Sequence, residues 1–225
     1  MNDDVVRRAP LFAALDEEAG RALLGEMSTR RMARGDVLFR EGEPGDSLYV
    51  IGEGKVKLGR TSLDGRENLV AVLGPGEMFG ELSLFDPGPR TMTATAVAQT
   101  QVMGLGHDSL TGLLSGRPEV AKSLLAALAK RLRRTNELLA DLVFTDVPGR
   151  VAKALLDLSS RFGRPVADGV MVSHDLTQEE LAQLVGASRE TVNKALADFT
   201  ARGWLRLEPR AVLLLDVERL QRRAR

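Results

Sequence analysis

The sequence from Thr177 to Phe199 is TQEELAQLVGASRETVNKALADF, and it predicts two short helices joined by a tight turn. Apolar residues recur at helical spacing on either side of Gly186. A glycine there supplies the positive φ that a tight turn needs and that side chains with a β-carbon resist. Thr177 and Glu180 have the spacing of a capping box, and Ser188 is a good N-cap for the second helix. The stretch therefore predicts a helix-turn-helix unit.

The second of these helices carries side chains of base-reading type on its outward, N-terminal part. They are Arg189, Glu190, Asn193 and Lys194. In a helix-turn-helix unit the second helix lies in the DNA major groove, where arginine bonds guanine and glutamate accepts from the cytosine amino group. An ordinary helical hairpin with a solvated, charged face is the alternative. The coincidence of both caps, the turn glycine and a small residue at the helix crossing, Ala182, favours DNA reading.

The composition is that of a globular protein with one or two domains. The chain has 225 residues, of which 44% are hydrophobic and 28% charged. It has no apolar run long enough to span a membrane and no signal-peptide pattern, so we expect a cytoplasmic protein with no membrane partner. Cysteine is absent, which excludes disulfides, thiolate metal sites and cysteine-ligated iron–sulfur clusters. The two histidines, His107 and His174, are expected on the surface and not at a metal.

The charge balance restricts how the chain could bind a nucleic acid. Lys and Arg number 31, as do Asp and Glu, so the formal net charge is zero. Residues 146–225 contain 13 Lys and Arg against 11 Asp and Glu, which is only slightly basic. Affinity for DNA must therefore come from the local placement of cations.

Residues 32–105 have the pattern of a small β-barrel. Short apolar stretches alternate there with glycine-rich turns such as Pro44-Gly45-Asp46 and Pro75-Gly76. Strands of this length at such close intervals are typical of a β-sandwich or jelly-roll barrel. A short helix from Asp16 to about Met27 is predicted before them.

A long helix is predicted from Pro118 to about Phe144, because proline suits a first helical position and no glycine or further proline follows in that stretch. Along it, steps of four, four, three, four and three residues join Leu124, Leu128, Leu132, Thr135, Leu139 and Leu142. This is a seam of coiled-coil type, and it predicts a homodimer in which the helix pairs with its copy. Packing on its own barrel alone is the alternative.

The helical pattern breaks at residues 145–150, where Pro148 disfavours helix at the residue before it. We expect a hinge between domains there, followed by a further helix from Gly149 to Phe162. The segments Trp204–Leu207 and Ala211–Leu215 predict a β-hairpin, which would make the C-terminal part a winged helix.

The predicted fold class is therefore α+β, in three parts. Residues 1–116 form an N-terminal jelly-roll domain, residues 117–145 a long dimerisation helix, and residues 146–225 a C-terminal winged helix-turn-helix domain.

One segment of the barrel breaks the alternating pattern. Residues Gly80 to Thr91 read GELSLFDPGPRT, and they offer backbone amides after a glycine, the Glu81 carboxylate, and Arg90 followed by a hydroxyl. Arginine with consecutive N–H groups suits a phosphate, while a glutamate suits a ribose hydroxyl. The residue types alone leave open a surface pair of Arg90 and Glu81 without any ligand.

GELSLFDPGPRT in the barrel and VGASRETVNKAL in the C-terminal part together closely resemble the motifs of the Crp/Fnr family of bacterial transcription regulators. Within that family the chain is most similar to the actinobacterial cyclic-AMP receptor proteins, from about Leu11 to Leu220. The two motifs are specific together, because each lies in the domain where the family has it.

The resemblance implies that the barrel segment is a phosphate-binding cassette for 3′,5′-cyclic AMP, acting as an allosteric effector. Arg90, Thr91 and the backbone of Ser83 would hold the cyclic phosphate, Glu81 would accept from the ribose 2′-OH, and Gly80 would allow close approach. In this family, polar residues of the long helix contact the adenine amino group, and one of them comes from the partner subunit. Thr135 and Asn136 stand at those positions. The implied set is Gly80, Glu81, Leu82, Ser83, Arg90, Thr91, Thr135 and Asn136, with no metal.

For DNA, the resemblance assigns base contacts to Arg189, Glu190 and Lys194. It assigns phosphate contacts to Thr177, Ser188 and Thr191. The implied half-site is TGTGA, with its inverted copy across the dyad. Lys194 stands where the family often has arginine, and this softens base discrimination because lysine lacks the planar fork of arginine.

The expected mechanism is a population shift, in which cyclic AMP favours the dimer state that spaces the two recognition helices for the groove. RNA polymerase is an expected partner, and the loop from Arg164 to Gly169 is a candidate contact with it. One alternative is a cyclic-nucleotide-binding regulatory subunit acting on a protein partner; another is a DNA-binding regulator with a different effector or none. We expect no enzyme, since the sequence has no nucleophile–base pair, metal cluster or P-loop.

Overall fold

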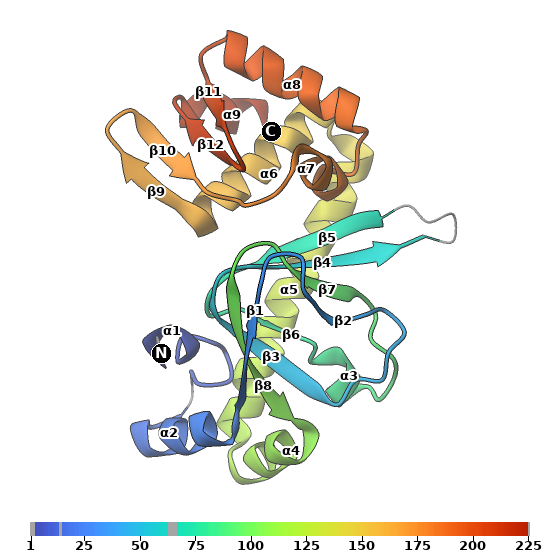
Figure 1. Cartoon of the computed structure of the whole chain (residues 1–225), viewed down its shortest axis with the longest axis vertical. Helices are drawn as coiled ribbons and strands as arrows, with labels where there is room; N and C mark the ends of the chain where they lie inside the picture. The colour runs from blue at the N-terminus through green and yellow to red at the C-terminus, as the bar shows by residue number, and fades with distance from the viewer. Residues whose placement is uncertain (1–2, 14, 63–66, 225) are drawn as a thin grey trace. The chain divides into compact units, whose positions relative to one another are not determined.

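The computed structural model describes residues 3–13, 15–62 and 67–224. The chain forms two compact units, of which the first comprises Met1–Arg60 and Ala71–Arg134 and the second Thr61–Val70 and Thr135–Arg225. Helices and strands are mixed, as the predicted α+β class requires, and Figure 1 labels them along the chain.

Two four-stranded sheets form the framework of the first unit. Their strand orders are β1-β8-β3-β6 and β2-β7-β4-β5, and the central pairs, such as β3 with β8 and β4 with β7, are antiparallel. The strand bounds are β1 Ser28–Met32, β2 Val37–Phe39, β3 Ser47–Glu53, β4 Val56–Thr61, β5 Glu67–Leu73, β6 Met78–Phe79, β7 Thr93–Ala96 and β8 Thr100–Gly106. The barrel predicted for residues 32–105 is confirmed, although β1 begins before that range and was not predicted.

Alternation along β3 divides the core of this unit into two clusters. Ile51 faces a cluster made by both sheets, together with Phe39, Phe79 and other buried residues. Leu48 and Val50 point the other way, toward a cluster made with the helices. Because side chains on a strand alternate between faces, one strand contributes to both cores.

Four short helices belong to the first unit. Their bounds are α1 Asp3–Val6, α2 Glu17–Glu26, α3 Leu82–Phe85 and α4 His107–Gly116. The predicted helix from Asp16 to Met27 is α2, because Asp16 caps it by accepting from the amide of Ala19 at 2.8 Å and Met27 lies at its C-cap.

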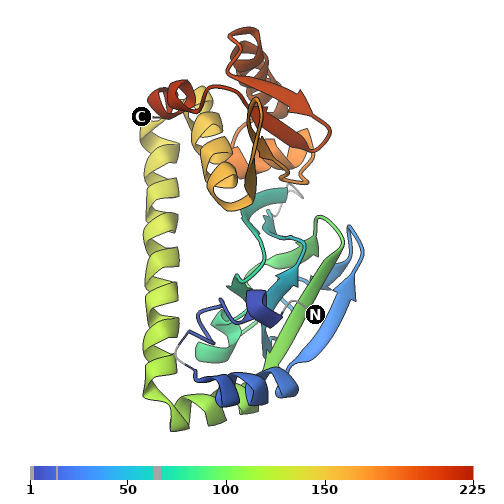
Figure 2. The same cartoon turned by 90° about the vertical axis from the view of Figure 1, so that its left-hand side faces the viewer.

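Helix α5 runs from Pro118 to Phe144, the range predicted from the sequence, and it is unbroken over its length (Figure 2). Its first turns are anchored by Val120 and Leu124, both buried against the helical core cluster. Further along, Leu125, Leu132 and Leu139 are 65%, 62% and 58% exposed. Leu132 and Leu139 belong to the predicted seam, but Leu124, which was predicted to begin it, is buried in the core of its own unit, and Leu125 is exposed in its place. The three exposed leucines are seven residues apart and form an apolar row on one face of α5.

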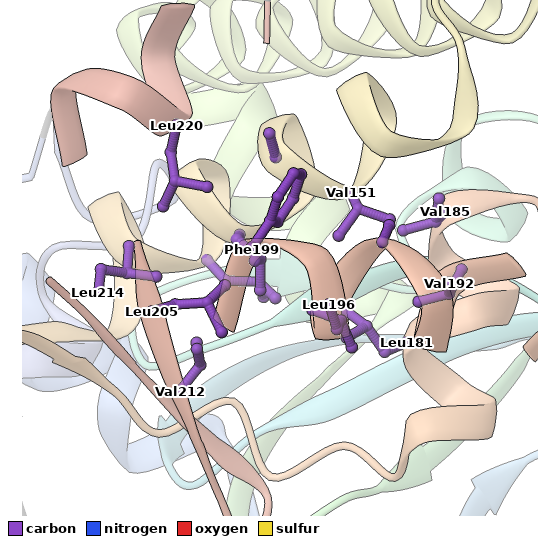
Figure 3. Packing of buried hydrophobic residues seen from close by; sticks show 14 of the residues in the cluster. Val151, Leu181, Val185, Val192, Leu196, Phe199, Leu205, Val212, Leu214 and Leu220 are labelled. Carbon is purple, nitrogen blue, oxygen red and sulfur yellow. The ribbon is translucent and has the colours of Figure 1, made fainter. Parts of the chain in front are cut away.

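The second unit contains a long helix, a helix-turn-helix pair and a four-stranded sheet of order β11-β12-β10-β9. Its elements are α6 Val147–Phe162, β9 Gly163–Val166, β10 Gly169–Val172, α7 Gln178–Val185, α8 Arg189–Ala201, β11 Leu205–Glu208, β12 Ala211–Leu214 and α9 Val217–Arg223. One cluster of buried side chains joins α6, α7, α8, α9, β10, β11 and β12, with Phe199 at its centre (Figure 3), while β9 is exposed. The helix-turn-helix and the β11–β12 hairpin are thereby confirmed.

The structure corrects three local predictions. Helix α6 begins at Val147 and not at Gly149, since a proline in the first turn removes only an amide that has no helical partner there. The expected loop from Arg164 to Gly169 is mostly the β9–β10 hairpin, and only residues 167–168 turn. His174 is 6% exposed and not on the surface, because its ring accepts a hydrogen bond from the amide of Leu176 at 3.1 Å.

Candidate functional site

The segment from Gly80 to Thr91 starts where β6 ends, and a backbone of left-handed conformation shapes its entry. Gly80 has a φ of +79°. A β-carbon there would also lie 2.9 Å from the Arg90 guanidinium and 3.2 Å from the Ser47 carbonyl. Glycine is therefore required both for its conformation and for the close approach of Arg90. Immediately beyond, Leu82–Phe85 form helix α3, where the sequence predicted a loop.

Arg90 is held by its neighbours but keeps unused hydrogen-bonding capacity. Its side chain is 4% exposed, and one terminal nitrogen donates to the Gly80 carbonyl at 2.8 Å. The guanidinium lies over the ring of Phe39, with 4.3 Å between its carbon and the ring centroid. Its Nε is buried without a partner among the described residues. A fixed arginine with spare donors is suited to an anion.

Glu81 is the second buried charge of the segment, and it is 1% exposed. Its Oε1 accepts from Nη1 of Arg131, on α5, at 2.9 Å. The other oxygen, Oε2, is buried without a partner in the described part of the chain. A buried acceptor with no partner is costly, so a ligand hydroxyl would relieve it. Glu81 thus pairs with Arg131 and not with Arg90, and the alternative of a surface pair is wrong.

These groups line one pocket. It brings together all six site residues predicted in the barrel, with Phe39, Leu58, Met92 and Arg131 added from the structure. The space that a water molecule can enter is about 30 Å³, room for only a few waters. Arg131 already occupies Oε1 of Glu81, which leaves Oε2 for a ligand.

Arg131 is the charged residue among the four pocket residues that the sequence did not predict. It lies inside a helix rich in Lys and Arg, where one more cation carries no local signal. Thr135 and Asn136 come four and five residues after it on α5, and both are exposed. Their assignment to the adenine amino group stays a prediction.

In the second unit, the helix ends form as predicted. Thr177 and Glu180 make the capping box of α7, with the Thr177 amide 2.7 Å from the Glu180 carboxylate. Gly186 ends the helix with a φ of +68°. Ser188 caps α8 by accepting from the amide of Thr191 at 3.2 Å. The turn therefore has the geometry that presents the first residues of α8 to solvent.

Of the predicted reading residues, Arg189, Glu190 and Lys194 lie on the surface of α8. Asn193 does not: it is half-buried, and its Oδ1 is buried without a partner among the described residues, which corrects its predicted outward placement. Glu190 and Lys194 form an ion pair of 2.7 Å, with side chains 78% and 75% exposed. Arg189 is exposed and has no ion-pair partner among the residues that the structure describes. Exposed pairs one helical turn apart are weak, so these groups can exchange their present contacts for others.

A second arginine links three parts of this unit. Arg150, in the first turns of α6, donates to the carbonyls of Thr145, Val185 and Gly186 at 2.9, 3.0 and 3.1 Å. Thr145 directly follows α5, Val185 is the last residue of α7, and Gly186 begins the turn before α8. One guanidinium thus connects the end of the long helix to the turn that positions the reading helix.

An N-cap strengthens the same junction. Asp146 accepts from the Gly149 amide at 2.9 Å and pairs with Arg223 of α9 at 2.5 Å. The Arg223 guanidinium, with the Gly149 amide, holds the pKa of the Asp146 carboxyl below its usual value. Lys153 of α6 also pairs with Asp141 near the end of α5. The ion pairs of Asp146 with Arg223 and of Asp141 with Lys153 had no signal in the sequence, because each joins residues that lie far apart along the chain.

Comparison with known proteins identifies both units. Residues 29–117 match the model of the cyclic nucleotide-binding domain, and residues 149–223 match that of the Crp-like helix-turn-helix domain. Over 223 residues the chain is 56% identical to a "CRP-like cAMP-activated global transcriptional regulator" of Mycobacterium tuberculosis, covering 99% of this chain and 100% of that protein. The chain belongs to the CRP-like family of transcriptional regulators.

Other CRP-like proteins are similar over almost the whole chain. The "Cyclic AMP receptor protein" of Thermus thermophilus is 37% identical, with 96% of this chain and 97% of that protein covered. The solved structure of FixK2 from Bradyrhizobium japonicum is 26% identical, covers 87% of this chain and 96% of its own, and has a TM-score of 0.78. The predicted family and function class are confirmed as those of a DNA-binding CRP-like regulator.

No helix in the described ranges combines the length and apolar character of a membrane span. Within the same ranges, no three His, Asp or Glu side chains gather as metal ligands would.

Proposed function

We propose that this protein is a cyclic-AMP-responsive regulator that binds a TGTGA-type palindrome as a homodimer. The observation that carries the proposal is the pair of buried, opposite charges in the barrel, each with an unused polar atom. Glu81 Oε2 and Arg90 Nε are both buried without partners in the described chain, and both residues line one pocket. An acceptor for a hydroxyl beside a donor for an anion suits a sugar phosphate.

The proposed roles follow from the chemistry of each group. Arg90 and Thr91, with the backbone around Leu82 and Ser83, hold the cyclic phosphate, and Gly80 lets the ligand approach the backbone. Glu81 accepts from the ribose 2′-OH. Thr135 and Asn136 of α5 contact the adenine amino group, one of them from the second subunit. Sequence resemblance supports these last two assignments.

For DNA, we propose that Arg189, Glu190 and Lys194 contact bases in the major groove. Their place on the first turns of α8, and their exposure, support this role. The phosphate contacts proposed are those of Thr177, Ser188 and Thr191. The hydroxyls of Ser188 and Thr191 lie 2.8 Å apart at the cap of α8, where backbone amides also favour an anion.

The proposed dimer forms through α5. Its row of exposed leucines at intervals of seven supports this interface, because such a row would otherwise remain in water. Two subunits related by a dyad present two reading helices to two inverted half-sites. Sedimentation at micromolar concentration should give twice the mass of the chain; a monomer would contradict the dimer.

The mechanism proposed is a shift between dimer states. Nucleotide binding stabilises the state with the better-formed pocket, and Arg150 transmits the position of the end of α5 to the turn before α8. The coupling is expected to change DNA affinity by about 5- to 150-fold. Proposed partners are DNA in the cytoplasm and RNA polymerase.

The test is a titration of a fluorescent TGTGA-palindrome duplex, and of a scrambled duplex of equal length, with and without cyclic AMP. Both are measured by anisotropy at one stated salt concentration, because affinity for DNA depends strongly on salt. We expect preference for the palindrome and tighter binding with cyclic AMP than with cyclic GMP. Equal affinity for both duplexes would overturn the DNA role. A palindrome preference that no cyclic nucleotide changes would overturn the effector.

A further inference from the structure

Arg90 is a buried cation that very few polar groups hold in place. In the described part of the chain it pairs with no carboxylate, and its guanidinium donates one hydrogen bond, to the Gly80 carbonyl at 2.8 Å. A buried charge without a partner is costly, and one hydrogen bond leaves the guanidinium free to turn about it. A further contact is therefore needed to stabilise the charge and to fix its orientation.

The ring of Phe39 supplies that contact. The centroid of this ring lies 4.3 Å from the guanidinium carbon of Arg90, and the centroid of the Tyr49 ring lies 5.8 Å from it. A cation over an aromatic face is attracted by the electron density of the ring, most strongly where water is excluded. A ring carries no net charge, so it stabilises the guanidinium without neutralising it. The contrast is Glu81, whose charge is paired with that of Arg131.

Two further rings hold the ring of Phe39 in place. Phe39 ends β2, whereas Tyr49 lies on β3 and Phe79 on β6, in the other sheet of the barrel. The ring centroids of Tyr49 and Phe79 lie 5.9 and 6.0 Å from that of Phe39, and 5.6 Å from each other. Aromatic rings attract one another at these separations. The face that Arg90 meets is thus part of a packed aromatic cluster.

The backbone of β2 departs from regular pairing at this point. Val37 pairs with Thr95 and Phe39 with Ala94, so two steps along β2 correspond to one along β7. Leu38 and Phe39 consequently belong to the same buried cluster, although neighbouring side chains on a regular strand face opposite sides. Such irregularities re-aim a side chain and are frequent beside functional sites. Here the irregularity turns Phe39 inward, where it also lines the pocket.

We infer that Phe39 is a positioning residue of the anion site, whose ring holds the guanidinium of Arg90 in place and leaves its charge for the phosphate of the nucleotide. This inference rests on the proposed cyclic-AMP site and adds a residue to it. Phe39 acts through Arg90, so loss of the ring should weaken recognition of the phosphate although every polar group of the pocket is retained.

Two matched variants separate this role from packing. Phe39→Leu removes the aromatic face and keeps an apolar side chain. The control, Phe79→Leu, makes the same change in the same aromatic cluster, at a ring without a cation–π contact to Arg90 in the described chain. Both are titrated with cyclic AMP in a calorimeter, well below their melting temperatures. The affinity should fall about 10-fold for Phe39→Leu, the effect of a desolvated cation–π contact, and Phe79→Leu should bind nearly as tightly as wild type.

A second measurement reports the orientation of Arg90 directly. It uses the two diastereomers of cyclic AMP in which sulfur replaces one exocyclic phosphate oxygen or the other. A guanidinium held in one orientation meets these two positions differently, so wild type should discriminate between the diastereomers. For Phe39→Leu the ratio of the two affinities should move toward one. Phe79→Leu should keep the wild-type ratio, because a general loss of stability lowers both affinities equally.

A third measurement keeps the shape of the ring. Phe39 is replaced by phenylalanines that carry one, two or three ring fluorines, each of which draws electron density from the aromatic face and so weakens its attraction for a cation. The affinity for cyclic AMP should fall stepwise with the number of fluorines. An apolar contact between the ring and the base would give no such fall, because a fluorinated ring remains apolar.

A stepwise fall, together with a diastereomer ratio that moves toward one in Phe39→Leu alone, would support the inference. Affinities that do not respond to fluorination would overturn it. So would equal losses in Phe39→Leu and Phe79→Leu with an unchanged ratio, because these would show that the ring only fills space. If wild type does not bind cyclic AMP, the proposed effector fails and the inference fails with it, whereas the other two results overturn the inference alone.

Discussion

The two proposed binding regions, the barrel pocket and helix α8, differ in the burial of their charged groups. In the barrel, Glu81 and Arg90 are 1% and 4% exposed, and each is fixed by a neighbour. On α8, the side chains of Glu190 and Lys194 are more than 70% exposed. Buried charges are held in one geometry and are expensive to leave unpaired, whereas exposed pairs are weak and replaceable. This difference supports the proposed roles of the two regions, a fixed site for one small ligand in the barrel and exchangeable contacts with DNA on α8.

The largest expected effect is that of Arg90→Ala. In the proposed complex, Arg90 forms a buried, hydrogen-bonded charge pair with the cyclic phosphate. Removing one partner of such a pair costs about 2–5 kcal/mol of binding free energy, so the affinity for cyclic AMP should fall by at least an order of magnitude. Calorimetric titration measures the loss. Arg40→Ala, an exposed arginine of the same unit, is the control and should leave affinity unchanged. Equal affinities for wild type and Arg90→Ala would refute the proposed phosphate site.

A smaller effect is expected when the ribose acceptor changes. Glu81→Gln keeps the size of the side chain but loses the charge, and hydrogen bonds to charged groups contribute about 1.5–3 kcal/mol. The measurement compares cyclic AMP with its 2′-deoxy analogue. Wild type should prefer cyclic AMP, and the variant should lose most of that preference. A preference that survives the substitution would place the ribose elsewhere.

On the exposed helix α8, Arg189→Ala should reduce the binding free energy by about 1–3 kcal/mol for the palindrome and by much less for a scrambled duplex. Anisotropy at one salt concentration measures both. Arg202→Ala is the matched control, because Arg202 follows the same helix at its other end, where it pairs with Asp198. Equal losses on both duplexes would show that Arg189 meets only phosphate.

The smallest expected effect is on stability, at the junction between α5 and α6. Asp146→Ala removes an N-cap and should lower the free energy of unfolding by about 1 kcal/mol at pH 7. The pKa of Asp146 is lower in the folded protein than in the unfolded chain. The carboxylate therefore stabilises the fold at any pH above its unfolded pKa of about 4, and this stabilisation is lost as the pH falls through the lower, folded pKa.

Urea unfolding of wild type and Asp146→Ala at pH 7 and about pH 3 checks this sign. The difference between the two proteins should shrink at the lower pH. The control is Asp168→Ala, which changes an exposed residue of the β9–β10 turn. Its free energy of unfolding should equal that of wild type at both pH values. A difference that grows as the pH falls would contradict the assigned cause.

The sequence predicted best those features that depend on local signals. The ends of α5 follow from Pro118 and from the break after Phe144, and the ends of α7 and α8 from their caps and Gly186. Capping is decided by residues three or four apart, so it can be read along the chain. The six barrel residues of the pocket were predicted because they lie in one continuous motif.

Features that depend on distant contacts were not predictable. Strand β9 is exposed along its length and lacks alternation, so nothing in its sequence marks it as a strand. Arg131 becomes part of the pocket only because α5 passes the barrel at Glu81. His174 is buried because the fold places a backbone amide against its ring. In each case the partner is supplied by tertiary structure and not by neighbours in sequence.

The final helix, α9, has a practical consequence. Leu220 and Ala224 belong to the buried core of the second unit, and Arg223 pairs with the cap of α6. A truncation before Leu220 would therefore remove core side chains of the unit that carries α8, so we expect it to impair DNA binding even though every residue of α8 is retained.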